Sequence, residues 1–296
     1  LVAARLVLGF GEGFVFTAGA TWTVDLAPAD RRGQAIGLYG LAIWGGLSIG
    51  PPIGEALLAL GSYPLVWAFA IAAPVLGALL ASCVPDDHVP AGGGTGGGPL
   101  IPVAARVPGA ALALCNIGYA ALAGFVVLHL ERTGAGHGPL VFTAFAVAVV
   151  LTRLLAGRLP DRLGPRSCAA AAALAEAAGL AVVASAGSAW TAGAGAVLMG
   201  VGFSTIYPAL ALLVVERADA GRTGTALGAF TAFFDAGVGV GAPLVGAIAA
   251  VGGYPAGFLV AAGCAAAAAA MATAAGRGGP GARGIRSGAW PARRSR

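Results

Sequence analysis

Nine long apolar segments separated by short polar breaks dominate the pattern of the chain. Each is long enough to cross a hydrocarbon layer about 30 Å thick, which takes roughly 20 helical residues. Because a segment in lipid must satisfy its backbone hydrogen bonds internally, we expect each to be a helix. Several breaks are only a few residues long, so consecutive helices should be antiparallel neighbours. The predicted spans are approximately residues 2–26, 35–60, 64–84, 107–129, 139–157, 168–187, 191–215, 223–250 and 254–275.

The composition agrees with a membrane solvent. Apolar residues make up 58% of the chain and charged residues 10%, whereas a soluble domain carries about 25% charged residues. The sequence therefore predicts an all-α membrane protein. Its four cysteines lie singly in apolar segments, without metal or disulfide spacing, and no catalytic dyad or phosphate loop is visible. We expect no enzyme activity, no metal and no cofactor. The cysteines are Cys83, Cys115, Cys168 and Cys264.

The arginines indicate the orientation of the spans. If the tail is cytoplasmic, 15 of the 17 basic residues fall in or beside cytoplasmic loops, as the positive-inside tendency requires. Arg5 and Arg132 are the exceptions. The basic pI near 9.4 therefore indicates topology, and we expect no nucleic-acid partner. The glycine-rich stretch at 91–98 is typical of a flexible linker.

An internal repeat relates the two ends of the chain. With a shift of 191 residues, "VDLAPADRRGQAIGLYG" aligns without a gap on "VERADAGRTGTALGAFT". Both units begin on the same side of the membrane, so the repeat is parallel, about an axis along the membrane normal. The aligned pairs include Arg31 and Arg222, Gly37 and Gly228, Gly46 and Gly237, Gly50 and Gly241, and Pro52 and Pro243.

The second unit follows the predicted spans at 107–187, whose counterparts in the first unit would precede residue 1. The chain also begins with Leu1 and not with Met. We therefore expect three further N-terminal helices in the complete protein, which would have two halves of six helices.

Three motifs resemble those of the major facilitator superfamily of secondary transporters. "RLVLGFGEG" (Arg5–Gly13) resembles the fourth-helix motif, and "GGLSIGPPIG" (Gly45–Gly54) resembles the fifth-helix motif of proton-coupled antiporters. "GRLPDRLGPR" (Gly157–Arg166) resembles the signature cytoplasmic loop of one half, with Pro160 and Pro165 as departures. The resemblance covers essentially the whole chain and implies helices four to twelve of twelve, in two pseudo-symmetric half-bundles.

The resemblance also implies a domain organisation and a cellular setting. Residues 1–84 would be the remainder of the N-terminal bundle, 85–106 a cytoplasmic linker, 107–275 the C-terminal bundle and 276–296 an arginine-rich cytoplasmic tail. We expect a multi-pass protein of the plasma membrane that works as a monomer when complete. Its partners would be a small-molecule substrate, protons and the lipid bilayer, with the proton gradient as the energy source.

The fifth-helix motif suggests a helix surface at the boundary between the halves. Gly46, Gly50 and Gly54 share one helix face and leave it smooth for close packing, while Pro51 and Pro52 bend the helix. In the family this helix packs between the halves, so we expect the motif to shape the conformational cycle. Ordinary tight helix packing is the alternative.

The signature loop suggests a cytoplasmic gate. Asp161 can accept hydrogen bonds from free amides at a neighbouring helix N-terminus, and the loop arginines can pair with acids at nearby helix ends. Such contacts would exist only while the cytoplasmic side is closed. The alternative is a positively charged turn without a switching role. The predicted gate residues are Asp25, Gly157, Arg158, Asp161, Arg162, Gly164, Arg166 and Glu216.

Charges inside the spans point to proton coupling, because each costs about 2.5–3.5 kcal/mol at a helix centre. Glu12 and Arg5 lie two helical turns apart on one face, and their repeat counterparts are Phe203 and Ala196, so the architecture does not require them. The family links the fourth-helix arginine to proton movement. We therefore expect Arg5, Glu12 and Asp235 to take part in coupling, although Asp235 could instead form a structural ion pair.

The substrate path is expected between the halves, lined by the spans at 2–26, 107–129 and 191–215. Helix–helix hydrogen bonding is an equal alternative for each polar candidate. The candidates are Asn116, Tyr119, Ser204, Thr205 and Tyr207.

The sequence thus predicts a proton-coupled exporter of small organic or drug-like molecules that works by alternating access. The alternatives are an uptake symporter or facilitator for a sugar or other metabolite, and a truncated product that does not transport.

Overall fold

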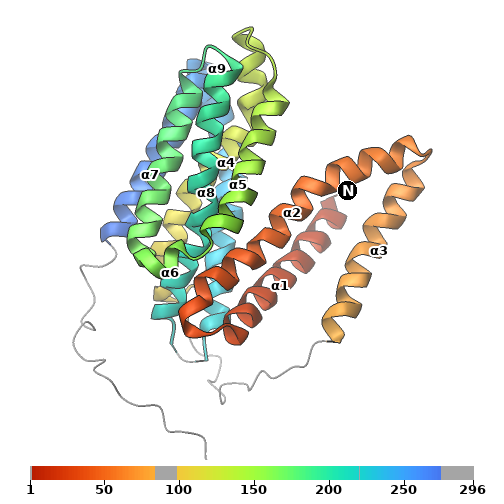
Figure 1. Cartoon of the computed structure of the whole chain (residues 1–296), viewed down its shortest axis with the longest axis vertical. Coiled ribbons are helices and arrows are strands. Elements are labelled where there is room, and N and C mark those ends of the chain that lie inside the picture. Colours follow the sequence, from red (N-terminus) through yellow and green to blue (C-terminus); the bar gives the residue numbers. More distant parts are fainter. Residues whose placement is uncertain (1, 84–98, 220, 275–296) are drawn as a thin grey trace, which may run out of the picture.

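The computed structural model describes residues 2–83, 99–219 and 221–274, and this part of the chain is helical without strands (Figure 1). The predicted linker up to residue 98 and the tail 276–296 lie outside the described residues. The helices are α1 (Val2–Leu26), the 3-10 turn η1 (Ala29–Arg31), α2 (Arg32–Ala59), α3 (Tyr63–Ser82), α4 (Val103–Arg132), α5 (Gly138–Ala156), α6 (Leu159–Leu163), α7 (Pro165–Ala184), α8 (Ala189–Arg217) and α9 (Thr223–Ala274).

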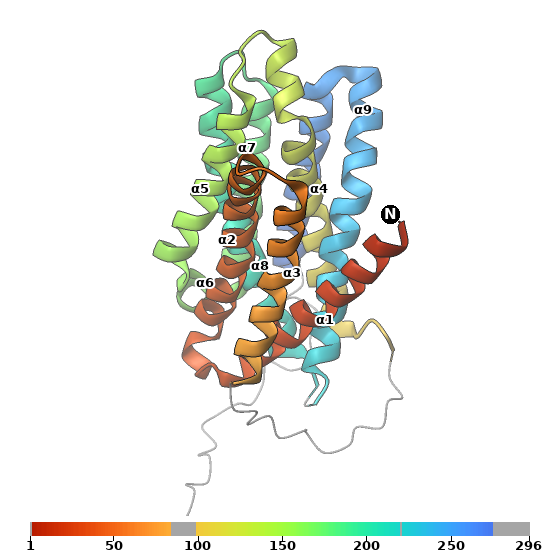
Figure 2. The same cartoon turned by 90° about the vertical axis from the view of Figure 1, so that its right-hand side faces the viewer.

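The all-α membrane fold expected from the sequence is confirmed. Six of the described helices, α3, α4, α5, α7, α8 and α9, are long and apolar enough to cross a membrane. The element α9 consists of two helices that meet at a kink at Gly253, where φ is 78°. The two spans predicted at 223–250 and 254–275 are therefore both present. Figure 2 shows the cyan and blue parts of α9 joined at one end of the molecule and running back alongside each other.

The half formed by α4–α9 contains most of the buried core. Its interior holds large fully buried side chains such as Phe145, Phe230 and Phe258. Glycines let its helices approach closely: a Cβ at Gly179 on α7 would lie 2.5 Å from the backbone nitrogen of Met199 on α8. Since lipid gives apolar helices no hydrophobic reason to associate, such close packing supplies the dispersion contacts instead.

The half formed by α1–α3 is more open. Tyr39 of α2 lies over Gly19 of α1, and its hydroxyl donates to the carbonyl oxygens of Val15 and Phe16 at 3.2 and 3.1 Å. Helix α3 has no buried residue among those described and exposes an apolar surface suited to lipid.

The two halves meet near α6 and diverge towards the opposite end of the molecule (Figure 1). Gly37 of α2 lies against Gly157 at the end of α5, since a Cβ added at Gly37 would be 3.9 Å from the Gly157 Cα atom. Gly46, Gly50 and Gly54, expected at the boundary between the halves, make no close contact there in this conformation, because in the described part nothing lies within 4 Å of a Cβ added at any of them.

The reason for this difference is that α2 leaves the other half beyond its first turns. Near α6, Gly37 and Gly40 of α2 therefore lie against the other half, whereas the motif glycines have no described neighbour within 4 Å of an added Cβ. The side chains of Pro51 and Pro52 lie outside the described part of the structure.

Candidate functional site

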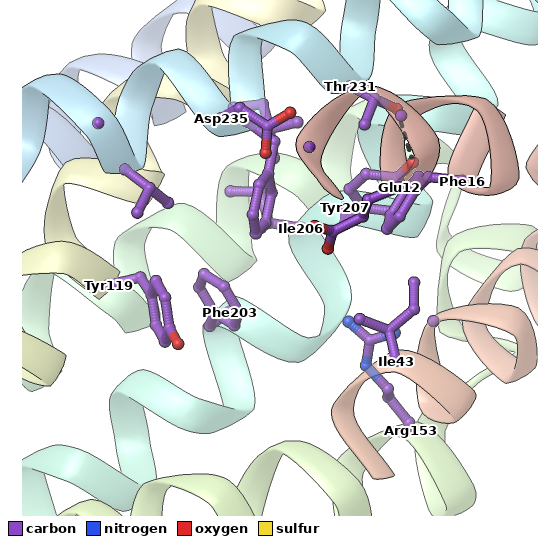
Figure 3. A pocket seen from close by; sticks show the side chains of 17 residues that line it. Glu12, Phe16, Ile43, Tyr119, Arg153, Phe203, Ile206, Tyr207, Thr231 and Asp235 are labelled. Atoms are coloured by element: carbon purple, nitrogen blue, oxygen red, sulfur yellow. Dashed lines mark hydrogen bonds between the residues drawn. The ribbon is translucent and has the colours of Figure 1, made fainter. Parts of the chain in front are cut away.

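A cavity of about 520 Å³ lies between the two halves (Figure 3). Its wall is built from α1 and α2 on one side and from α4, α5, α8 and α9 on the other. Volumes of about 300–1,000 Å³ are typical of small-molecule sites. The cavity is thus in the place expected for a substrate path and has the size for a small organic molecule.

Two carboxyl groups face the cavity from opposite halves. Glu12 comes from α1 and Asp235 from α9, and in Figure 3 both side chains point into the space between the helices. Both residues are exposed, and the two groups are close enough to interact electrostatically. Within the described residues neither has a salt-bridge partner. The structure therefore brings together two of the three predicted coupling residues, while the side chain of Arg5 lies outside the described part.

An aromatic wall lies at another part of the cavity. The rings of Tyr119 on α4 and Phe203 on α8 are stacked, with centroids 5.2 Å apart, and both contact Phe145 behind them. Phe203 is the repeat counterpart of Glu12. Equivalent positions in the two halves thus give the cavity an acid on one side and a ring on the other.

A third part of the cavity wall contains two further rings and a hydroxyl pair. Phe16 on α1 and Tyr207 on α8 contact each other across the halves, with centroids 5.9 Å apart. The Tyr207 and Thr231 hydroxyl oxygens are 3.3 Å apart and share a hydrogen bond. Tyr119 and Tyr207 therefore both line the cavity, as expected from the sequence.

The other three expected lining residues do not face this cavity. Ser204 donates to the carbonyl oxygen of Val149 on α5 at 2.8 Å, and Thr205 donates to the Gly202 carbonyl of its own helix at 3.1 Å. Asn116 donates to the Leu112 carbonyl at 2.9 Å. All three side chains are buried, and their polar groups are bonded to helix carbonyl oxygens instead of facing the cavity.

Arg153 is a cavity residue that the sequence pattern had placed at the cytoplasmic edge. It is only 4% exposed, and its Nη1 donates to the Gly37 carbonyl oxygen of α2 at 3.4 Å. The guanidinium occupies the space that a Cβ at Gly40 would fill. Its position a full turn before Gly157, inside an apolar span, was the available signal. Arg153 links the two halves where they converge.

The expected contact between Asp161 and a helix N-terminus is present. The backbone amide of Gln34, in the first turn of α2, donates to Asp161 Oδ2 at 3.1 Å. Arg158, expected to pair with an acid, instead donates from Nε to the Gln34 side-chain oxygen at 2.8 Å. The reason is that Gln34 already lies beside α6 and offers its side-chain amide there.

The remaining predicted gate residues lie around this contact or at nearby helix ends. Gly164 has φ 81° and connects α6 to α7, a backbone conformation that favours glycine. Arg166 and Glu216 both act electrostatically on Arg217 at the end of α8. Asp25 lies in the last turn of α1, and Arg162 lies in the last turn of α6.

One further acid is buried away from the cavity. Glu176 on α7 is 0% exposed and lies against Cys115 and Gly118 of α4. Among the described residues, no cluster of three or more histidine, cysteine, aspartate or glutamate side chains could hold a metal ion.

The sequence matches one family model and several proteins of the same family. The family model described as Major Facilitator Superfamily matches residues 1–138 and 108–293. The MFS-type transporter STM4428 of Salmonella typhimurium is 34% identical over 270 residues, which cover 90% of this chain and 68% of that protein. The MFS-type transporter YhhS of Escherichia coli K12 is 32% identical over 268 residues, covering 90% and 65%. The chain thus spans about two thirds of the length of these relatives.

Solved structures share the fold. The fucose:proton symporter FucP of Escherichia coli superposes with a TM-score of 0.71 at 18% identity, covering 89% of this chain and 73% of that one. The human organic anion transporter MFSD10 gives a TM-score of 0.76 at 16% identity, covering 92% and 70%. At these identities the likeness establishes the arrangement of helices.

Proposed function

Because the chain belongs to the major facilitator superfamily of membrane transporters, we propose that it is part of a proton-coupled exporter of small organic molecules. The observation that carries this proposal is the cavity between the halves, with one carboxyl from each half. Members of the family are transporters and generally not enzymes, so the site is interpreted as a binding site for cargo.

Alternating access is supported by the unequal contact between the halves. Asp161, Arg158 and Arg153 all bond to α2 near α6, while the opposite ends of the halves diverge. In the proposed cycle these bonds hold the cytoplasmic side closed and break when the halves rock. The glycine face at Gly46, Gly50 and Gly54 would then close against the other half at the outer side.

Proton coupling is assigned to Glu12 and Asp235. A carboxyl group can bind and release a proton, and both of these groups face the cavity. In the proposed cycle each would carry a proton across when the cavity changes side. Arg5, on the same face of α1 as Glu12, would bias this exchange as the family motif implies.

The complete transporter is proposed to contain a further three-helix unit beside α1 and α2. In the second repeat, Gly200 of α8 packs closely against α5, since a Cβ there would lie 2.7 Å from the Phe145 carbonyl oxygen. Its counterpart Gly9 has no atom within 4 Å in the described part. A helix equivalent to α5 would pack against Gly9.

The proposed setting is the plasma membrane, with the linker and the C-terminus in the cytoplasm and a monomer as the working unit. Labelling of a cysteine introduced into the tail tests the orientation. Labelling by an impermeant reagent from outside intact cells would contradict it.

The test of function is flux in proteoliposomes that contain the full-length protein. An inward-directed proton gradient should drive extrusion of compounds from a panel, and Glu12→Gln should abolish the gradient-driven part. Glu131→Gln, which removes an exposed carboxylate at the end of α4, should leave it intact. Gradient-driven flux that survives Glu12→Gln would contradict the coupling role, and accumulation in the direction of proton entry would show a symporter instead.

A further inference from the structure

We propose that the cargo of this cavity is an amphipathic organic cation with a flat aromatic part. This inference rests on the proposed function and adds the chemical class of the substrate. It is carried by which charges in the cavity are accessible, by the position of the two acids on opposite halves, and by the stacked rings beside them.

Among the described side chains that line the cavity, the accessible charge is negative. Glu12 and Asp235 are exposed to the cavity, whereas Arg153 is 4% exposed and donates to a backbone carbonyl across the halves. A ligand entering the cavity therefore meets two carboxylates before it meets a cation. An anionic ligand would have to overcome both carboxylates and to displace the Arg153 guanidinium from Gly37.

The two acids are also neighbours across the boundary between the halves. When both are ionised they repel each other, and water is partly excluded from a site of this kind, so the repulsion is stronger than in bulk solvent. A positive charge held between them relieves that repulsion and attracts both halves to the same ligand. A proton can do the same, so cargo and protons would compete for one site.

The ring of Tyr119 supplies the second half of the recognition, with the ring of Phe203, which is 2% exposed, stacked against it. Aromatic faces attract cations placed over them, and they stack on flat aromatic groups. Figure 3 shows both rings beside the same cavity as Asp235 and Glu12. A molecule that joins a positive group to an aromatic body would contact both parts at once.

The test uses two probes of equal shape and opposite charge, tetraphenylphosphonium and tetraphenylborate. Binding to the full-length protein in nanodiscs is measured by equilibrium dialysis at about pH 8, where carboxyl groups of ordinary pKa are ionised. The cation should bind saturably and the anion should not. Equal or tighter binding of the anion would overturn the proposal, and so would the absence of saturable binding of the cation.

Matched variants separate the charge from the fold. Asp235→Asn and Glu12→Gln should each weaken binding of the cation at least about tenfold, whereas Asp235→Glu, which keeps the charge, should retain most of it. Glu131→Gln should bind like the parent. The double variant Glu12→Gln with Asp235→Asn gives the background from partition into lipid. Unchanged affinity in folded Asp235→Asn and Glu12→Gln proteins would also overturn the proposal.

The aromatic part has its own readout. Tyr119→Leu should weaken tetraphenylphosphonium by a larger factor than tetrabutylammonium, because both cations lose the attraction of the ring for a positive charge but only tetraphenylphosphonium also loses ring stacking. An equal loss of affinity for both cations would contradict the proposed stacking of an aromatic part of the cargo on the ring.

Failure of this inference and failure of the proposed function give different results. Proton-driven flux of neutral or anionic compounds without binding of the cation would support the proposed transport function and contradict the proposed cationic substrate. Binding of the cation without any proton-driven flux would support the proposed class of ligand and contradict proton coupling.

Discussion

Phe16 and Tyr207 occupy equivalent positions in the two repeats, 191 residues apart, and their rings meet across the boundary between the halves. Each also contacts the next ring of its own half: Phe16 contacts Tyr39 at 5.8 Å, and Tyr207 contacts Phe230 at 5.2 Å. Tyr39 and Phe230 are repeat counterparts as well. The four rings therefore form a pseudo-symmetric cluster beside the cavity, with Phe16 and Tyr207 in its wall.

Removal of one ring should loosen this part of the cavity wall. Phe16→Ala removes the ring contact with Tyr207 that crosses the boundary, and such a pair is worth about 0.5–1.5 kcal/mol, so we expect a few-fold increase in opening. The measurement is the rate at which an impermeant thiol reagent, applied from the cytoplasmic side, labels Thr231→Cys in a protein without other cysteines.

The control for this prediction is Phe10→Ala on the same helix, since Phe10 is 72% exposed and lies away from the cluster. The same labelling rate in Phe16→Ala and Phe10→Ala would contradict a closing role for the ring cluster.

Neutralisation of Asp161 should also favour opening at the α6 end. Its carboxylate accepts from an amide in the first turn of α2, where the helix dipole favours an anion by about 0.3–1 kcal/mol. Asp161→Asn should raise the same labelling rate a few-fold. Asp30→Asn changes an exposed acid of η1 and should leave the rate unchanged; an increase of equal size there would indicate a general charge effect.

A side chain at Gly40 should oppose the conformation in which the halves meet at α6. Gly40→Val would displace the Arg153 guanidinium, so the halves should close less often at the α6 end. Spin labels on exposed Leu58 and Leu140 would report the change as a shift in their distance distribution.

Gly50→Val provides the matched control, because in the described part no atom lies within 4 Å of a Cβ at Gly50. It should leave this conformation populated and should slow transport, if the motif face closes in the other state. Undiminished transport in full-length Gly50→Val would refute the role assigned to the motif.

Close packing within the second half should be sensitive to a single methyl group. Gly179→Ala places a Cβ 2.5 Å from the Met199 nitrogen and 2.6 Å from the Gly195 carbonyl oxygen, and overpacking of this kind costs about 1–3 kcal/mol. We expect a lower Tm, by several degrees, in thermal unfolding of the purified protein. Gly193→Ala, with no atom within 4 Å in the described part, should not lower the Tm.

Some features followed from local sequence patterns. The spans of α1–α5, α7, α8 and the two helices of α9 were predictable, since length and apolarity are enough to define a helix in lipid. The contact of Asp161 with a helix start was also predictable, because the loop motif places an anion where free amides occur. The repeat predicted that Glu12 and Phe203 occupy equivalent places.

Other features depended on which face of a helix turns inward, and periodicity in a membrane helix is too weak to show that. Ser204 and Tyr207 are three residues apart on α8, yet one bonds to α5 and the other lines the cavity. Arg153 was expected beside a cytoplasmic loop, but it is buried between the halves and donates a hydrogen bond to α2.

The sequence by itself determined the solvent, the helices and the repeat, because these depend on composition and on distances along the chain. The tertiary structure decided which charged residues share the cavity, where the halves touch and which glycines pack closely against a neighbouring helix. Those properties arise from the relative placement of the two half-bundles. That placement is set by the free energies of contact between segments far apart in the sequence, which no local pattern encodes.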